Sequence, residues 1–212
     1  MAINYNASTV LTSLKSCYDY SNPKSLINST TWKDLIRGTV STTSGADTNI
    51  GNEPWMNGNG NQMTILTVID KKGTHVGYAE HPVNKWIDTT DASFVLYHFG
   101  TTSGEDNNFR WHANAGGTWK NISNSFMGVN GNKYIIVLQY NALNGGQLWI
   151  NGAKVSSRAG SGTIASTTNP ALLRGPQGSV TAQVLAFQFW DRELSDNEII
   201  LACANYKHRY GI

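Results

Sequence analysis

The sequence is poor in charge and in long apolar runs, and both shortages exclude classes of protein. Charged residues make up only 14% of its 212 residues, against roughly 25% in typical soluble domains. The formal net charge is +2 and no segment gathers Lys and Arg, whereas nucleic-acid-binding proteins normally carry a basic cluster that neutralises phosphates. No apolar run approaches the roughly 20 residues that span a bilayer. We therefore expect neither nucleic acid nor a membrane among the partners.

A secretory signal is also missing. Residues 1–6 read M-A-I-N-Y-N, with neither a basic stretch nor an apolar one. The sequence therefore predicts a protein made in a cytoplasm without a signal peptide.

Cysteine is scarce, with Cys17 and Cys203 near opposite ends of the chain. These two thiols can meet only if the terminal strands pair, which the sequence does not decide. The simpler interpretation is two buried thiols that act as small apolar side chains. Neither Cys nor His residues show the paired spacing of a zinc site, so no metal centre is predicted.

Asn, Ser, Thr and Gly fill the place of the missing charges, and they favour turns over helix interiors. Short apolar or alternating runs between such turns predict strands. These strands are expected at residues 14–20, 63–70, 93–99, 109–113, 133–140, 148–150, 153–155 and 180–190. Asn151-Gly152 joins two of them as a tight hairpin turn.

Two other stretches complete the expected organisation. Residues 42–60 read as a long polar loop, and residues 71–73 (K-K-G) as a turn. The one predicted helix starts at Ser195, where Glu198 completes a capping box, and ends before Tyr210. The sequence thus predicts an all-β fold, an antiparallel β-sandwich (jelly roll) with one short C-terminal helix, as a single domain over residues 1–212.

The closing motifs resemble those of a known family. Residues 148–152 (L-W-I-N-G) are similar to the L-Y-x-N-G hairpin of laminin-G-like, concanavalin A-like lectin sandwiches. Residues 184–199 (V-L-A-F-Q-F-W-D-R-E-L-S-D-N-E-I) resemble their V-x-x-Y-N-R-A-L-S-x-x-E-I ending, and residues 205–211 resemble the tail that follows it. The resemblance implies a sandwich fold and a binding role.

The opening motifs narrow the resemblance. Residues 19–25 (D-Y-S-N-P-K-S) and 30–35 (T-T-W-K-D-L) resemble D-A-x-N-P-x-S and T-T-W-x-D-L, a pair found in structural proteins of tailed bacteriophages. The usual S-G-N after the second motif is replaced by I-R-G at residues 36–38, and residues 38–132 resemble the family poorly. A ligand site in the middle loops therefore does not carry over.

Catalysis finds little support in the sequence. Glycoside hydrolases need two carboxylates on either side of the scissile bond, and hydrolases of this family carry them as E-x-D-x-x-E on one strand. None of the glutamates begins that pattern; they are Glu53, Glu80, Glu105, Glu193 and Glu198. No nucleophile elbow, zinc-protease motif or phosphate-binding loop is present. We expect a protein that is not an enzyme.

Residues 109–119 (F-R-W-H-A-N-A-G-G-T-W) favour a sugar-binding site, because they combine aromatic rings with polar side chains. Indole rings stack on the apolar faces of sugars while polar groups bind the hydroxyls. The candidate ligand-binding residues are Arg110, Trp111, His112, Asn114 and Trp119. The alternative is that Trp111 alternates into the core and Trp119 shields a loop.

No cofactor is predicted, and calcium has only a weak case. Asp88 and Asp91, or Asp106 with loop carbonyls, are the oxygen-bearing groups that favour it. His75, His81, His98 and His112 are scattered along the sequence and indicate no metal cluster.

Three hypotheses follow. The first is a non-catalytic virion protein of a tailed bacteriophage (a capsid decoration, head fibre or tail-associated module) that contacts other virion proteins or itself and adheres to surface glycans. Such a protein leaves its host by lysis and needs no export signal. The second is a free carbohydrate-binding lectin module, and the third is a glycoside hydrolase.

Overall fold

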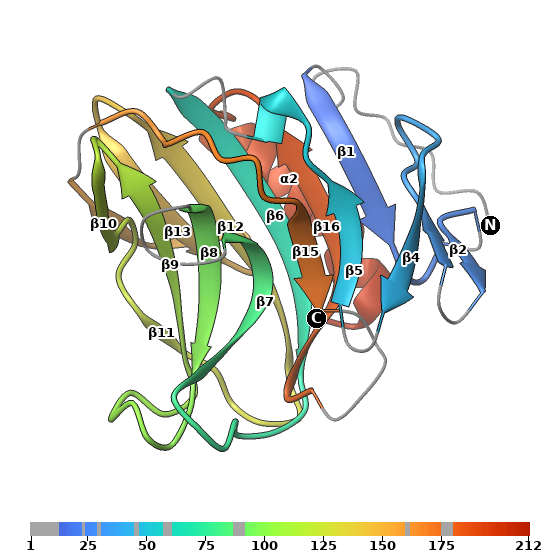
Figure 1. Ribbon diagram of the computed structural model, residues 1–212. Coiled ribbons are helices and arrows are strands. Elements are labelled where there is room, and N and C mark those ends of the chain that lie inside the picture. Colours follow the sequence, from blue (N-terminus) through green and yellow to red (C-terminus); the bar gives the residue numbers. More distant parts are fainter. Residues whose placement is uncertain are drawn as a thin grey trace.

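The computed structural model describes residues 13–22, 24–28, 31–44, 47–56, 61–86, 92–159, 162–174 and 180–212. Two antiparallel β-sheets lie face to face, and one helix covers the far side of the smaller sheet (Figure 1). The predicted β-sandwich with a C-terminal helix is therefore confirmed.

The smaller sheet has six strands and brings the two ends of the chain together. β1 pairs with β16, so that Cys17 lies opposite Gln188. The strand order is β1 (Leu14–Asp19), β16 (Ala182–Trp190), β6 (Gln62–Lys71), β12 (Lys133–Asn141), β13 (Gly145–Ile150) and β14 (Ala153–Arg158). Asn151 and Gly152 join β13 to β14, both with positive φ (52° and 79°), as the predicted hairpin turn requires.

The larger sheet has ten strands, and two strands at one edge carry the candidate residues. Its order is β10 (Thr118–Asn121), β9 (Asn108–Ala115), β8 (Ala92–Phe99), β7 (Ala79–Trp86), β15 (Ala171–Arg174), β5 (Asp47–Gly51), β4 (Val40–Ser44), β3 (Thr31–Lys33) and β2 (Leu26–Asn28), with β11 (Phe126–Met127) also paired to β9. One face of this sheet packs on the smaller sheet, and the other is its outer face.

The core between the sheets follows from the two-residue period of a strand. On β8, Phe94 and Leu96 point inward, whereas Val95, Tyr97 and Phe99 form a separate apolar cluster on the outer face. Trp32 lies in the inter-sheet core with 1% of its surface exposed.

A second core lies between the smaller sheet and α2 (Asp196–Tyr210). Trp190 is fully buried there rather than between the sheets. Ser195 and Glu198 form the predicted capping box. The helix is longer than expected, because Tyr210 still belongs to it and the left-handed Gly211 (φ 68°) ends it.

Cys17 and Cys203 both belong to this second core as free, buried thiols. Burial raises the pKa of Cys17 to about 11 and that of Cys203 to about 12. The interpretation as small apolar side chains is confirmed.

Two predictions about loops are wrong. Residues 42–60 contain strand β5 and the end of β4, and they bury Ile50 and Met56 in the inter-sheet core. Pairing of β5 with β15, a strand far along the chain, overrides the polar composition. Lys71 is the last residue of β6 and is fully buried, not part of an exposed turn.

Candidate functional site

The alternation of β9 divides the predicted ligand-binding residues between two faces. Trp111 is fully buried in the inter-sheet core and packs on Phe94. Arg110, His112 and Asn114 point to the opposite side and are half-buried. Trp111 therefore lies apart from the other candidates, as the core alternative anticipated.

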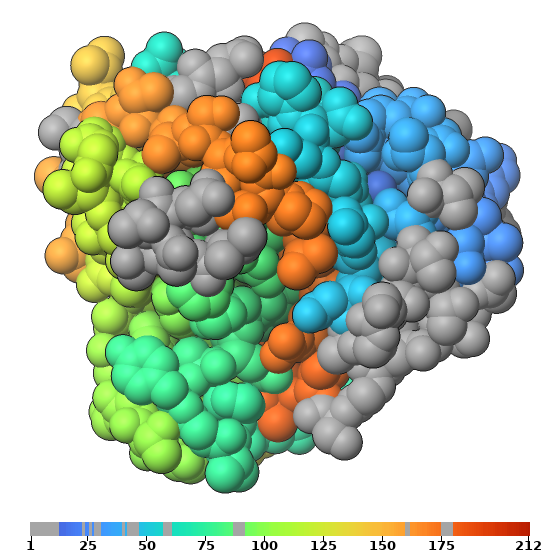
Figure 2. Space-filling model, in the orientation of Figure 1, coloured from blue at the N-terminus to red at the C-terminus, as the bar shows by residue number. Residues whose placement is uncertain are grey.

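Trp119 joins the outer group from the neighbouring strand. It pairs with Asn114 across β9 and β10, and its ring centroid lies 5.8 Å from that of His112. Residues of β9 and β10 (yellow-green) meet segment 162–174 (orange) on this side of the molecule (Figure 2). The structure thus brings Arg110, His112, Asn114 and Trp119 together on the outer face.

Aromatic rings from β7 and β8 extend this group. Tyr97 lies between two histidines, with ring centroids 4.7 Å from His81 and 4.6 Å from His112. Trp86 stacks near Trp119 at 6.5 Å with an interplanar angle of 22°. We call the whole group the outer-face cluster; it consists of His81, Trp86, Ser93, Tyr97, Phe99, Arg110, His112, Asn114 and Trp119.

Polar atoms without partners gather in the outer-face cluster. Among the described residues, Trp86 Nε1, Ser93 Oγ, Asn114 Oδ1 and both ring nitrogens of His112 are buried and lack a hydrogen-bond partner. Such atoms are rare in folded proteins and each costs free energy. Donors and acceptors are both present, and they lie among aromatic rings. This combination suits a ligand that offers hydroxyl groups and an apolar face.

The charges of the cluster are largely compensated. Burial, with the positive charge of Arg174, lowers the pKa of His81 to about 4. Burial and the charges of Arg110 and Arg158 lower that of His112 to about 4 as well. Both imidazoles are therefore neutral near pH 7. The Arg110 guanidinium pairs with Glu105 and lies over the Phe99 ring at 5.3 Å.

The sequence did not identify three members of the cluster as candidate ligand-binding residues: His81, Trp86 and Tyr97. His81 and Trp86 belong to β7, where Pro82 and two register shifts disturb the alternation. Tyr97 lies in the predicted strand 93–99, whose apolar residues are continuous rather than alternating. A strand whose apolar residues are continuous is usually buried on both faces. The run at residues 93–99 therefore indicates that the outer face of β8 is covered as well as its inner face.

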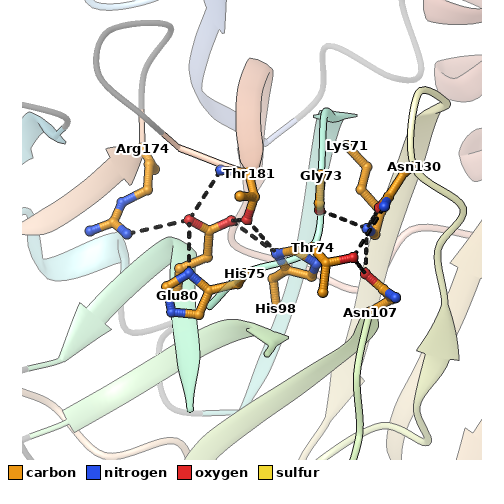
Figure 3. Close-up of polar contacts among 10 residues, drawn as sticks. All are labelled: Lys71, Gly73, Thr74, His75, Glu80, His98, Asn107, Asn130, Arg174 and Thr181. Atoms are coloured by element: carbon orange, nitrogen blue, oxygen red, sulfur yellow. Dashed lines mark hydrogen bonds and ion pairs between the residues drawn. The ribbon is translucent and has the colours of Figure 1, made fainter. Parts of the chain in front are cut away.

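A second polar group lies between the sheets at one end of the sandwich (Figure 3). The buried Glu80 carboxylate accepts hydrogen bonds from Thr181 and from His98 Nδ1, the latter at 2.9 Å. Arg174 Nη1 lies 3.7 Å and His75 Nδ1 4.0 Å from the same carboxylate. These four residues come from different strands and loops, and Glu80 holds them together.

The Glu80–His98 pair resembles part of a catalytic relay, but its geometry differs. Burial opposes ionisation of Glu80, yet hydrogen bonds from His98 and Thr181 lower its pKa. Burial lowers the pKa of His98 more than Glu80 raises it, so His98 is neutral. A relay places the nucleophile and the carboxylate on opposite ring nitrogens. Here Thr181 and Glu80 both lie at Nδ1, and the buried Nε2 has no partner among the described residues.

The remaining glutamates are engaged elsewhere. Glu53 pairs with Arg37, Glu193 accepts from Asn141, and Glu198 pairs with Arg192. Arg192, working against burial, lowers the pKa of Glu198 to about 2. Each of these three carboxylates is thus bound by an arginine or asparagine side chain.

No group of three or more His, Cys, Asp or Glu side chains within the described residues is arranged to hold a metal ion. Asp106 is exposed in the turn before β9. Asp88 and Asp91 lie outside the described residues. The helix in the described part is too short and too polar to cross a membrane.

Comparison with known proteins supports the architecture. A family model described as the concanavalin A-like lectin/glucanases superfamily matches residues 78–200. This range contains the whole outer-face cluster and the motif at residues 184–199, whereas the opening motifs lie before it. No curated protein matches the sequence significantly.

Solved structures share the fold at low sequence identity. Trypanosoma rangeli sialidase in complex with sialic acid has a TM-score of 0.60 and 10% identity, over 94% of this chain and 33% of the sialidase chain. The binding domain of botulinum neurotoxin DC in complex with rat synaptotagmin II has a TM-score of 0.59 and 9% identity, over 91% of this chain and 51% of the other. The chain thus spans about a third of the sialidase and half of the toxin domain, and the likeness concerns the fold alone.

Proposed function

This chain belongs to the concanavalin A-like lectin/glucanases superfamily, and on that premise we propose that it is a non-catalytic protein that binds glycans through the outer-face cluster. The observation that carries the proposal is the set of unpartnered polar atoms around Trp86, His112 and Asn114. Hydroxyl groups of a sugar supply both donors and acceptors, and they would satisfy these buried atoms once the side chains that cover them move aside on binding.

The aromatic rings supply the second half of the interaction. Trp86 and Trp119 are half-buried and near-parallel, so they offer extended apolar surface at little conformational cost. A sugar ring lying against an indole would bring its hydroxyl groups to the polar atoms at the base of the cluster. Two structural neighbours, a sialidase in complex with sialic acid and a toxin binding domain in complex with synaptotagmin II, accord with a binding role.

The absence of catalysis is part of the proposal. The Glu105 carboxylate beside the outer-face cluster is engaged by Arg110, and the Glu80 carboxylate, whose charge acts on His81, is engaged by His98 and Thr181. Hydrolysis of a glycosidic bond needs a general acid and a second carboxylate about 5–10 Å away. The neutral imidazoles of His81 and His112 do not supply that pair.

The setting that we propose is the surface of a tailed-bacteriophage particle, with other virion proteins or a second copy of the chain as partners. This part rests on the opening and closing motifs alone. A free lectin module would use the same cluster in the same way. The two settings differ in whether the protein is found on purified particles.

Glycan-array binding of the purified protein tests the proposal. We expect saturable binding to one class of glycan, equal with calcium and with chelator, and no release of reducing ends. Trp119→Ala should abolish binding, whereas Trp55→Ala, which removes a half-buried indole outside the cluster, should keep it. A blank array, or equal binding by wild type and Trp119→Ala, would contradict the proposal.

A further inference from the structure

Lys71 is fully buried and yet its ammonium group has a complete set of partners. Nζ donates to Gly73 O at 2.9 Å, to Asn107 Oδ1 at 2.8 Å and to Asn130 Oδ1. The three oxygens come from three separate loops, which meet at one end of the sandwich (Figure 3). All three acceptors are uncharged, so the ammonium is the cation at the centre of an oxygen cage.

The cage is closed by a ring of hydrogen bonds. Asn130 Nδ2 donates to Thr74 Oγ1 at 3.1 Å, and Thr74 Oγ1 donates to Asn107 Oδ1 at 2.9 Å. This ring fixes both amide orientations, so that each Asn turns its oxygen toward Lys71. The stem is equally confined, because a Cβ on Gly128 would come within 2.8 Å of Lys71 Cδ.

A second buried lysine repeats the arrangement. Lys85 is fully buried, and its Nζ donates to Asn52 Oδ1 at 2.6 Å and to the carbonyl oxygens of Thr167 and Asn169, both at 2.9 Å. Again the acceptors come from loops that are distant in sequence. Carbonyl and amide oxygens are also among the ligands of calcium, which takes about six to eight of them, whereas three suffice for the three protons of an ammonium group.

We propose that the Lys71 ammonium links three loops in the way that a bound metal ion does in other proteins. Removal of its side chain should then leave a binding site for a small organic ammonium ion. The cage holds loop 72–75 against the turns around Asn107 and Asn130. Glu105, which pairs with Arg110, lies in the same turn as Asn107. The inference concerns the stability of these loops and does not depend on the proposed ligand.

Chemical rescue of Lys71→Ala tests this. Alanine keeps Cβ, and n-propylammonium restores the missing three carbons and the ammonium group. We expect the unfolding midpoint of Lys71→Ala to fall by about 5–10 °C, because three buried oxygens lose their donor. Propylammonium should then raise the midpoint saturably, while 1-propanol and calcium should not. Wild type and Lys72→Ala, a change at an exposed neighbouring lysine, should not respond to propylammonium.

A second variant separates charge from volume. Lys71→Met keeps most of the stem but no ammonium, so it should be destabilised and should not respond to propylammonium. If Lys71→Ala is recovered only unfolded, the readout becomes its refolding yield with propylammonium against propanol. Equal rescue by propanol would mean cavity filling alone, and calcium rescue would mean an ordinary metal site. Either result, or no rescue at all, would overturn the proposal.

Discussion

The two outer surfaces of the sandwich are both rich in aromatic rings, but they treat polar atoms differently. Under α2, the Tyr210 hydroxyl lies 2.8 Å from Asp19 Oδ1 and 2.9 Å from Leu185 O, and Trp149 Nε1 donates to Gln139. In the outer-face cluster, the indole of Trp86 and the imidazole of His112 have no partner among the described residues. Both surfaces are therefore buried, but the outer-face cluster gathers several unpartnered polar atoms around two neighbouring rings, whereas the tyrosine and tryptophan groups named under α2 have partners.

The largest effect should come from breaking the helix side. Trp190→Ala removes a fully buried side chain from the second core and should lower the free energy of unfolding by about 3–5 kcal/mol. Urea unfolding measures this. Leu201→Ala, on the exposed side of α2, is the control and should change stability by less than about 0.5 kcal/mol. A loss of less than about 1 kcal/mol for Trp190→Ala would mean that α2 is not part of the folded core. Trp190→Ala protein that does fold should still bind glycan, because Trp190 lies outside the outer-face cluster.

The next largest effect should be a loss of folding stability at acid pH, caused by two histidines of the outer-face cluster. The unfolded chain protonates histidine near its ordinary pKa of about 6.5, whereas folded His81 and His112 accept a proton only near pKa about 4. The unfolded state binds more protons between these values. Stability is therefore full above pH 6.5 and falls as the pH drops toward 4, by up to about 3 kcal/mol for each histidine.

Urea unfolding at several pH values between 7 and 4 checks this. His112→Phe should lose distinctly less stability over that window than wild type, because one of the two histidines is gone. Equal losses in the two proteins would show that His112 is not held neutral by the fold.

The smallest and most telling change is His112→Phe at pH 7. Phenylalanine keeps the ring contacts with Tyr97 and removes two unpartnered nitrogens, so stability should rise by about 1 kcal/mol. Glycan binding should be lost in the same variant. Leu194→Ala on the helix side should do the opposite, with lower stability and unchanged binding. A destabilised His112→Phe that still binds would remove the distinction between the two surfaces.

Most of the fold was predictable from the sequence because it rests on local signals. Short apolar runs mark strands such as β6 and β12, and the Asn151-Gly152 turn and the Ser195 cap mark element ends. β4 and β5 escaped prediction because their Thr- and Asn-rich residues become strands only by pairing with β15 and with each other. Such pairing is a long-range effect that a local pattern does not carry.

The candidate site was predictable in part for the same reason. Alternation from Arg110 to Asn114 separates Trp111 from its neighbours, but the sequence does not say which face is covered. His81 and Trp86 come from a strand with register shifts, and Lys71 from a stretch that reads as a turn. Only the assembled sheets show that these residues meet aromatic rings or loop oxygens.

The seven tryptophans allow the central claim to be tested in one titration. Indole N–H signals of nitrogen-15-labelled protein should be followed by NMR while the glycan selected on the array is added. Binding through the outer-face cluster predicts shifts for Trp86 and Trp119, with the core indoles of Trp32, Trp111 and Trp190 unchanged. Shifts confined to Trp55 or Trp149, with Trp86 and Trp119 unmoved at saturation, would contradict it.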